Sequence, residues 1–588
     1  MKRMLLILVA SVLSYTASLG QWNSDPATNL VVWPEDESYY NTQMLVAPNG
    51  NIWLAAARPL TNLGVTISLQ LIDSTGNLLF EEPLTVSEYK ARTWVSVGDF
   101  LYVDSDGNAI ITVTDCRNDP EAGEYGYESY TAYKVSQKGE LLWGKEGVSL
   151  DGENTYDLVA AMRITQIADG SYIFAWMHNH KENTNMMSIK MQRVSADGEI
   201  LWNPEETCLH DHAGKIAYMY PYIVDAGKNQ VILLWAQGSN QDIYARKIDF
   251  DGTSVWSEDT RIYRSGWGSI PIWTLIDVKP SGDGGLIMSW NDDRFLTNIE
   301  SAYLTYVKPN GEIGFMAGED GQKLGYSGFR ALSVRCNYDP KSDSFYAMWY
   351  ECNSGQSWNR VVAQRVSKDG ELLWGEEGLE LKPMELTNYG YFSVQNGIDD
   401  EIAFFYMRNY AGSFGDVEAF VTTVNVNDTT ARRESEFTKG TRVSEKAGLT
   451  TTPMVDGKFW VAKWTDGGRV EDEVKVDRLM MQRINNDFTL GNPNGDNAVE
   501  GVKAEANNFV ALATLVDGEA MFAVDMPQTG AATLAIYNVN GALVATPFDG
   551  ELAAGKRYIE WNANVPAGIY VATFTSAQGV QTVKLLVK

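Results

Sequence analysis

Charged side chains follow a short apolar segment at seven places along the chain. Carboxylates, guanidinium groups and an imidazole that converge on one concave rim could bind a polar ligand. Two carboxylates at a suitable separation could also carry out acid–base chemistry on a glycosidic bond. We name these side chains the rim residues: Arg58, Asp115, Arg117, His178, Asp292, Asp293, Arg294, Glu351, Arg408 and Asp466.

Aromatic residues in the segments between these repeats add a second kind of contact. A tyrosine or tryptophan ring combines an apolar face with a polar group, which suits the ring of a sugar. The alternative is that the charges are solvated loop residues and that the aromatic rings pack between neighbouring sheets. The aromatic residues of these segments are Tyr156, Tyr218, Tyr220, Trp267, Trp273 and Tyr389. The predicted ligand-binding residues are Arg58, Arg117, His178, Asp292, Arg294, Glu351, Arg408, Asp466, Trp267 and Tyr220.

All four histidines of the chain fall within one repeat. Residues two apart in an extended segment project to the same side, so each of two histidine pairs presents both rings together. Four imidazoles, with Cys208 and Asp211 nearby, could bind zinc or copper. The alternative is a polar, partly exposed loop cluster, and the function inferred below requires no cofactor. The histidines are His178, His180, His210 and His212.

The elements that must position these groups are four short β segments, repeated eight times. In the clearest copy a first segment at 330–337 is followed by an apolar run at 345–349 and a third segment at 360–367. Asp369-Gly370 then leads into a fourth segment at 371–381, and Asp-Gly between two such runs is a strong hairpin signal. Eight copies of four strands predict an all-β protein, with an eight-bladed β-propeller over residues 21–490.

The last repeat lacks its fourth segment, because the chain runs from residue 484 into a turn and a stretch rich in Gly, Asn and Pro. At the other end, the segment 29–33 precedes the first strand of the first repeat and has no repeat of its own. We predict that this N-terminal strand completes the last sheet. Such a closure would remove the free sheet edges.

The turn between the third and fourth segments recurs as Ser-x-Asp-Gly-x-x-x-Trp at 195–202 and 367–374. It resembles the Asp-box of sialidase-like propellers, which reads Ser-x-Asp-x-Gly-x-x-Trp. Gly198 and Gly370 lie one position too early for that motif. We therefore interpret these units as hairpin turns with a packing tryptophan, and no sialidase arginine triad can be assigned.

Composition and the N-terminal residues limit the partners. A formal charge of −29 over 588 residues disfavours nucleic acid, which needs a cationic surface. Residues 1–20 combine a basic start with a short apolar run, as a secretory signal peptide does, and that run is too short to span a bilayer. No later segment is apolar enough to be transmembrane. We expect the four cysteines to be unpaired, because Cys116 and Cys352 occupy equivalent places in distant repeats.

Residues 491–502 form a predicted linker, and residues 503–588 then show the alternating segments of a small β-sandwich. This tail resembles the C-terminal sorting domain of the type IX (Por) secretion system of Bacteroidetes-type bacteria. The residues that carry the resemblance are 534–541, Leu552, Gly555, 566–571, Gly579 and the ending Lys584-Leu585-Leu586-Val587-Lys588. The resemblance implies the type IX secretion machinery as a partner and export through the outer membrane, to the cell surface or the extracellular medium.

These observations together predict a secreted or cell-surface propeller that binds a glycan or glycopeptide, or a protein ligand. Two alternatives remain open. The first is a glycoside hydrolase or lyase that uses the rim carboxylates, although no catalytic residue can be assigned. The second is a structural or adhesion protein whose propeller only presents surface. The sequence does not decide whether the protein is an enzyme.

Overall fold

The computed structural model divides the chain into two compact units, Met1–Asp496 and Asn497–Lys588. The boundary between the units falls within the predicted linker. Each unit is all-β in the part that is described. The structure describes residues 22–33, 41–59, 65–87, 89, 98–117, 127–152, 158–180, 183–203, 218–238, 241–264, 276–293, 299–410, 417–439, 444–469, 475–492, 509–511, 519–526, 528–562, 564–577 and 579–587.

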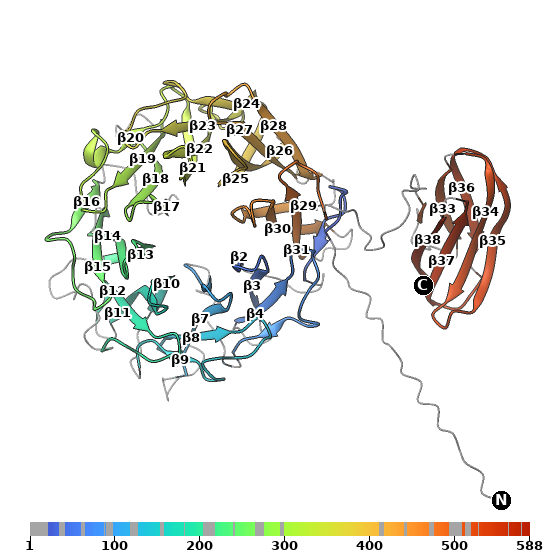
Figure 1. Cartoon of the computed structure of the whole chain (residues 1–588), viewed down its shortest axis with the longest axis horizontal. Helices are drawn as coiled ribbons and strands as arrows, with labels where there is room; N and C mark the ends of the chain where they lie inside the picture. The colour runs from blue at the N-terminus through green and yellow to red at the C-terminus, as the bar shows by residue number, and fades with distance from the viewer. Residues whose placement is uncertain are drawn as a thin grey trace, which may run out of the picture. The chain divides into compact units, whose positions relative to one another are not determined.

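The described residues of the first unit form eight antiparallel sheets, which we number 1 to 8 in chain order. Figure 1 shows these sheets arranged around a common centre, which is the arrangement of a β-propeller. Sheet 1 consists of β2 (Asn41–Val46), β3 (Ile52–Pro59), β4 (Val65–Ile72) and β5 (Leu84–Thr85), and sheet 2 of β6 (Leu101–Val103), β7 (Ala109–Asp115), β8 (Ser129–Val135) and β9 (Val148–Ser149). Sheet 3 consists of β10 (Leu158–Gln166), β11 (Tyr172–His180) and β12 (Asn183–Val194). Sheet 4 consists of β13 (Tyr218–Asp225), β14 (Gln230–Gln237), β15 (Asp242–Asp249) and β16 (Thr260–Tyr263).

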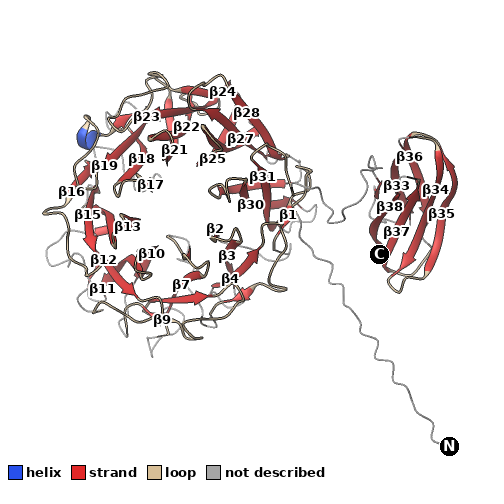
Figure 2. Cartoon of the chain, viewed as in Figure 1, coloured by secondary structure: helices blue, strands red, loops and turns tan. Residues whose placement is uncertain are grey.

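Sheets 5 to 8 complete the ring, and strands dominate the described chain throughout (Figure 2). Sheet 5 consists of β17 (Asp277–Pro280), β18 (Leu286–Asp292), β19 (Ser301–Val307) and β20 (Gln322–Lys323), and sheet 6 of β21 (Arg330–Asp339), β22 (Ser344–Cys352), β23 (Asn359–Val366) and β24 (Leu379–Glu385). Sheet 7 consists of β25 (Thr387–Asn396), β26 (Glu401–Tyr410), β27 (Val417–Asn425) and β28 (Arg432–Thr438). Sheet 8 consists of β29 (Ser444–Thr451), β30 (Phe459–Arg469), β31 (Lys475–Asn485) and β1 (Leu30–Val31).

The eight apolar runs of the sequence are the second strands of the eight sheets, β3, β7, β11, β14, β18, β22, β26 and β30. Each second strand is hydrogen-bonded on both edges and covered on both faces, so its side chains are buried almost continuously. In β7 and β18, for example, every residue is buried. A strand in this position has no solvated face, which explains why its sequence does not alternate.

The fourth strands begin later than the sequence predicts. After the Asp369-Gly370 turn the chain makes one isolated bridge, Val366 to Leu372, and β24 starts only at Leu379. Between them Gly375 and Gly378 adopt positive φ angles of 86° and 78°, and such left-handed residues interrupt an extended strand. In sheet 3 the expected fourth strand, after residue 203, lies outside the described residues.

Neighbouring sheets are joined at the turn that follows each third strand. In sheet 3, the indole of Trp202 and the guanidinium of Arg193 both donate to the carbonyl oxygen of Phe250, at 3.1 and 3.2 Å. Trp143 donates in the same way to the turn carbonyl of Ala196 in sheet 3, at 3.1 Å. Trp256 donates to that of Pro309 in sheet 5, at 3.0 Å. The repeated tryptophan therefore packs at a hairpin turn, as the sequence suggested, and in Trp143, Trp202 and Trp256 its indole also bonds the next sheet.

The N-terminal strand closes the ring in the predicted way. Leu30 pairs with Met481 and Val31 with Met480, so β1 is the fourth strand of the sheet that contains β30 and β31. The backbone N–H of Val32 adds a hydrogen bond to the carbonyl of Leu479 at 2.9 Å. Leu30, Val32 and Trp33 are buried in one core with residues of sheets 1 and 8. This pairing joins the two ends of the repeat region.

The second unit contains two sheets around one core. One sheet pairs β32 (Phe509–Ala511), β33 (Glu519–Met526) and β36 (Gly555–Asn562), and the other has the order β35-β34-β37-β38. Phe522 and Trp561 from the first sheet share a buried cluster with Leu534 and Phe574 from the second. The strands of the second sheet are β34 (Gly530–Asn538), β35 (Leu543–Leu552), β37 (Gly568–Ser576) and β38 (Gly579–Val587).

The described residues contain a single helical element, a 3₁₀ turn at Gly318–Asp320. No helix in the described ranges is long and apolar enough to cross a bilayer. Cys336 and Cys352 are buried free thiols, and burial raises the pKa of both. Residues 1–20 and Cys208 lie outside the described residues.

Candidate functional site

The first strands of the sheets lie nearest the centre of the ring, as β10, β13, β17, β21 and β25 show in Figure 1. Five of the first strands carry a β-bulge at the same place, where the register against the second strand shifts. The shifts fall between Ala160 and Arg163, Met219 and Tyr222, Leu332 and Arg335, Gly390 and Ser393, and Ala447 and Thr450.

The second residue of each bulge has a left-handed backbone. The φ angles are 58° at Ala161, 52° at Tyr220, 59° at Ser333, 55° at Tyr391 and 68° at Gly448. Four of these five residues are not glycine, although a side chain in this conformation costs about 1–2 kcal/mol. Bulges and left-handed non-glycine residues gather beside binding and active sites, where they aim side chains. The bulges therefore favour a binding site at the inner strands of the ring.

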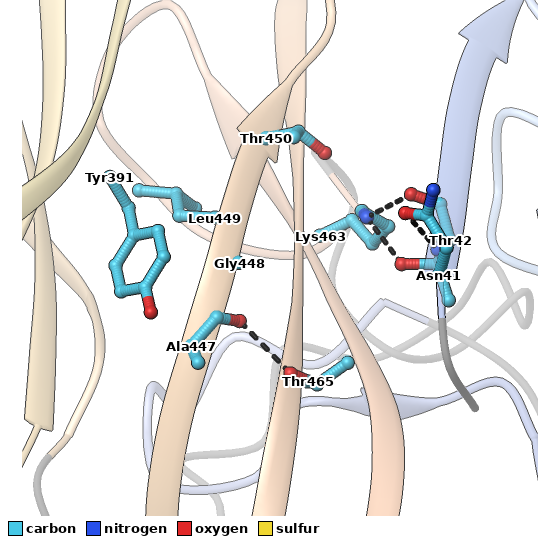
Figure 3. A pocket seen from close by; sticks show the side chains of 9 residues that line it. All are labelled: Asn41, Thr42, Tyr391, Ala447, Gly448, Leu449, Thr450, Lys463 and Thr465. Carbon is cyan, nitrogen blue, oxygen red and sulfur yellow. Dashed lines mark hydrogen bonds between the residues drawn. The ribbon is translucent and has the colours of Figure 1, made fainter. Parts of the chain in front are cut away.

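The larger pocket of this inner region has a volume of about 420 Å³ and is shown in Figure 3. It includes two bulge residues, Tyr391 and Gly448, and it draws on sheets 1, 7 and 8. Tyr391 is 50% exposed, so one aromatic ring is available at the pocket. The complete lining is Asn41, Thr42, Tyr391, Ala447, Gly448, Leu449, Thr450, Lys463 and Thr465.

Lys463 is the buried cation of this pocket. Its amino group donates to the backbone carbonyl of Thr42 at 2.9 Å and to the Thr42 hydroxyl at 2.6 Å, as Figure 3 shows. The side chain is only 2% exposed, and burial lowers the pKa of its ammonium group to about 7. The contact joins sheet 8 to sheet 1 at the inner strands.

A second pocket of about 210 Å³ shares Leu449 and Thr450 with the first. Its charged residues include Asp277 and Lys279, whose carboxylate and amino groups are 3.4 Å apart. The charge of Asp277 raises the pKa of Lys279, and its carboxylate also accepts the backbone N–H of Cys336 at 2.9 Å. The full lining is Asp277, Lys279, Arg335, Cys336, Phe392, Ser393, Val394, Gln395, Leu449, Thr450 and Thr451.

Hydroxyl and amide side chains line both pockets. Ser393 and Thr451 share a hydrogen bond of 2.7 Å, and Gln395 donates to both of them at 3.2 Å. The larger pocket has no carboxylate among its described lining residues. Its chemistry is that of a hydrogen-bonding site with one aromatic face and one buried amino group, which suits a polar ligand.

The rim carboxylates are held within their own sheets. Asp292 is 2% exposed and accepts the indole N–H of Trp290 at 2.8 Å. Glu351 is 1% exposed and accepts from Trp349 at 3.1 Å and from the Ser327 hydroxyl at 2.7 Å. Glu351 also forms an ion pair with Arg360 at 2.7 Å. Asp466 lies 3.9 Å from Lys446.

The rim arginines are bonded in the same way. Arg117 pairs with Asp115 at 2.6 Å and stacks over the Tyr89 ring at 3.8 Å. Arg408 pairs with Glu418 at 2.5 Å, and the Arg58 guanidinium donates to the Ser68 hydroxyl at 2.7 Å. Each of these partners lies in the same sheet as the rim residue or beside it. These contacts account for the buried charges, and ligand binding by the rim remains a prediction.

His178 and Tyr220 have different surroundings. His178 is buried in β11, with Val159 and Ser188 as its neighbours across the sheet. Tyr220 is the left-handed residue of the sheet 4 bulge, and burial raises the pKa of its phenol. His180 ends β11, but its side chain is not described. His210, His212, Trp267 and Arg294 lie outside the described residues, so the metal hypothesis stays a prediction.

The inner pocket contains residues that the sequence did not single out. Tyr391, Gly448 and Lys463 are examples. Tyr391 sits in a first strand that reads as ordinary alternating sequence, and Lys463 sits in an apolar run that reads as core. The first strands recur in the repeats, and an extra residue in such a strand implies a β-bulge. A comparison of the first strands with one another could therefore have predicted the bulges from the sequence.

No protein-family model matches the sequence, and no curated protein matches it. Solved structures that resemble it include an alpha-L-arabinanase of Penicillium chrysogenum complexed with arabinobiose, at 11% identity and a TM-score of 0.34, covering 60% of this chain and 97% of that one. An ulvan lyase of a polysaccharide lyase family has 9% identity and a TM-score of 0.40, and the match covers 79% of this chain and 96% of that one. Such low identities and TM-scores say nothing about what this chain binds.

Proposed function

We propose that this protein is an exported, eight-bladed β-propeller that binds glycans at the inner face of its ring. Eight sheets in the described residues and the pairing of β1 with β31 support a closed wheel of eight blades. The two sheets that share a core after residue 509 support a β-sandwich as the C-terminal domain.

The observation that carries the glycan proposal is the half-exposed ring of Tyr391 beside the polar groups of the larger pocket. A sugar ring offers an apolar face for stacking and hydroxyl groups for hydrogen bonds. The pocket supplies the amide of Asn41 and the hydroxyl group of Thr450, and the Thr465 hydroxyl, which donates to the carbonyl of Ala447 at 3.1 Å, can still accept a hydrogen bond. Both kinds of contact are therefore available to one ligand.

Binding is proposed rather than hydrolysis or elimination, because the rim carboxylates already have partners. Asp292 is engaged by Trp290, and Glu351 by Trp349, Ser327 and Arg360. A general acid or base must be within reach of the proton it transfers. Burial at 2% and 1% exposure does not favour that role.

Export is proposed from the leader at residues 1–20 and from the resemblance of the tail to type IX sorting domains. The test is expression in a bacterium that has the type IX system, with and without residues 503–588. We expect the full chain at the cell surface or in the medium, and the shortened chain in the periplasm. Surface display of the shortened chain would overturn the sorting role of the tail.

The glycan proposal is tested by titrating the protein with soluble neutral and acidic polysaccharides. The Tyr391→Ala variant should lose roughly ten-fold in affinity for the bound glycan. Leu142→Ala, which removes an exposed aliphatic side chain from sheet 2, should bind as the wild type does. Equal affinities of the wild type and Tyr391→Ala would remove the inner pocket from the binding site.

A further inference from the structure

One end of sheet 6 carries a group of exposed apolar side chains. Tyr326 is 53% exposed, Phe329 40%, Trp358 47% and Leu386 52%. Three of the four are aromatic, and all lie in segments that enter or leave the strands of this sheet. A soluble protein usually buries such rings, so several exposed together point to an interaction site.

The strand register places three of these side chains in one row. Arg330 pairs with Cys352, Cys352 with Asn359, and Asn359 with Glu385. The residues one step beyond these pairs are Phe329, Asn353, Trp358 and Leu386, so they follow one another across β21, β22, β23 and β24. Neighbouring strands are about 4.8 Å apart, so the row spans roughly 14 Å.

The row is held in place by bonds beneath it. The side chain of Asn353 accepts the backbone N–H of Ser357 at 3.0 Å and of Trp358 at 3.2 Å, which fixes the loop that carries the tryptophan. The guanidinium of Arg360 lies 5.4 Å from the centre of the Phe329 ring and is anchored to Glu351. Such rings lose little freedom when a ligand covers them.

The polar groups beside the row define the charge of the ligand. Arg360, the guanidinium next to Phe329, is already shared between Glu351 and Glu380 at 2.7 and 3.1 Å. Glu385 pairs with Asn359 in the backbone register of the sheet, and the backbone N–H of Tyr326 donates to the backbone carbonyl of Glu376, whose side chain is exposed. The amino group of Lys323 lies 5.0 Å from the centre of the Tyr326 ring, so this end of the sheet carries both signs of charge. Carboxylates accept hydrogen bonds from the hydroxyl groups of a neutral sugar, and an ammonium group donates to them, which favours a neutral ligand over a strongly charged one.

We propose that the row of Phe329, Asn353, Trp358 and Leu386, with Tyr326 beside it, is a second glycan-binding site that takes a neutral oligosaccharide. The aromatic rings stack on the apolar faces of successive sugar units, and the Asn353 amide lies between them. This site rests on the proposed glycan-binding function but is separate from the inner pocket. It would bind an extended chain along the end of the sheet, whereas the inner pocket receives a compact group.

The experiment measures binding of soluble β-glucan, xylan, galactomannan and linear α-glucan, with polygalacturonate as the acidic probe. Calorimetry and affinity electrophoresis are applied to the wild type, Trp358→Ala, Trp358→Phe and Tyr391→Ala. Met316→Ala, which removes a side chain that is 99% exposed and outside the row, is the matched control. Trp358 is half exposed, so its replacement is expected to leave the midpoint of urea unfolding unchanged.

We expect Trp358→Ala to lose roughly ten-fold in affinity for a neutral polysaccharide, with Trp358→Phe retaining most of it. Unchanged affinity in Trp358→Ala, with loss in Tyr391→Ala, would overturn this site and leave the proposed function in place. Binding of polygalacturonate alone, lost in Tyr391→Ala, would also overturn this site and leave the proposed function in place. Failure of every polysaccharide to bind would overturn both, and a Trp358-dependent protein partner found instead would replace the glycan assignment.

Discussion

Trp22 donates its indole N–H to the backbone carbonyl of Ser74 at 3.0 Å. Ser74 occupies the same turn position in sheet 1 that Ala196 and Phe250 occupy in sheets 3 and 4, and those carbonyls accept from Trp143 and Trp202. The N-terminal segment therefore supplies sheet 8 with both a fourth strand and the repeated tryptophan. Arg483 corresponds to Arg193 of sheet 3, because its guanidinium also donates to the turn carbonyl, that of Ser74, at 2.7 Å.

Replacing Trp22 should weaken the closure of the ring. Trp22 is fully buried, so Trp22→Ala is expected to lower the free energy of unfolding by ~3–5 kcal/mol. Trp22→Phe keeps most of the packing and loses the hydrogen bond, which is worth ~1 kcal/mol. Urea unfolding followed by fluorescence measures both.

The control for the hydrogen bond is Trp374→Phe. The Trp374 indole nitrogen is buried, and among the described residues it has no hydrogen-bond partner. The two Trp→Phe changes remove the same atoms, but only Trp22 loses a bond. Equal losses in the two variants would show that the Ser74 contact adds nothing to the closure.

The bulges can be tested at two glycines that lie in neighbouring first strands. Gly448 has a φ of 68°, and a Cβ added there would approach no atom closer than 4.0 Å, so Gly448→Ala costs backbone strain alone. We expect a loss of ~1 kcal/mol in the free energy of unfolding. Gly390 precedes the left-handed residue of its bulge and has open space around it. Gly390→Ala should leave the free energy of unfolding unchanged or raise it slightly. An equal loss of stability in both variants would show that the left-handed backbone at Gly448 is not the cause.

Lys463 should make stability depend on pH. Burial lowers the pKa of its ammonium to about 7, whereas a lysine in an unfolded chain titrates near pH ~10. Between these values the unfolded chain holds a proton that the folded protein has released, so the free energy of unfolding rises with pH. From pH 7 to 9 the wild type should gain up to ~2 kcal/mol relative to Lys463→Met. Urea unfolding at the two pH values measures this, and a constant difference would rule out the lowered pKa.

Glu351→Gln separates a structural carboxylate from a ligand-binding one. The carboxylate accepts from Trp349 and Ser327 and pairs with Arg360, so its neutralisation should cost ~2 kcal/mol of stability. Affinity for a glycan bound in the inner pocket should stay within two-fold of the wild type, because Glu351 is 1% exposed and does not line that pocket. A large loss of affinity with unchanged stability would restore the rim hypothesis at this residue.

The repeat in the sequence determined much of this architecture. Apolar runs without alternation identified the eight second strands, because a strand covered on both faces has no reason to alternate. The missing fourth segment of the last repeat identified the N-terminal partner, and β1 pairs with β31 accordingly. Alternating segments near 520–525, 532–538 and 568–575 marked strands of the second unit, which the structure places in β33, β34 and β37. The local pattern of apolar and polar residues was sufficient to predict each of these strands.

The site depended on the tertiary structure. Lys463 and Thr42 are 421 residues apart and meet only because the ring closes. Nothing in the apolar run around Lys463 shows that its amino group is buried, since a lysine's pKa is set by neighbours from other strands. The rim residues were predicted from the ends of strands, but Trp290 in the same strand bonds the Asp292 carboxylate, and Arg360 in the paired strand bonds that of Glu351. Strand order follows from short-range pattern, whereas a pocket follows from long-range packing that no local pattern encodes.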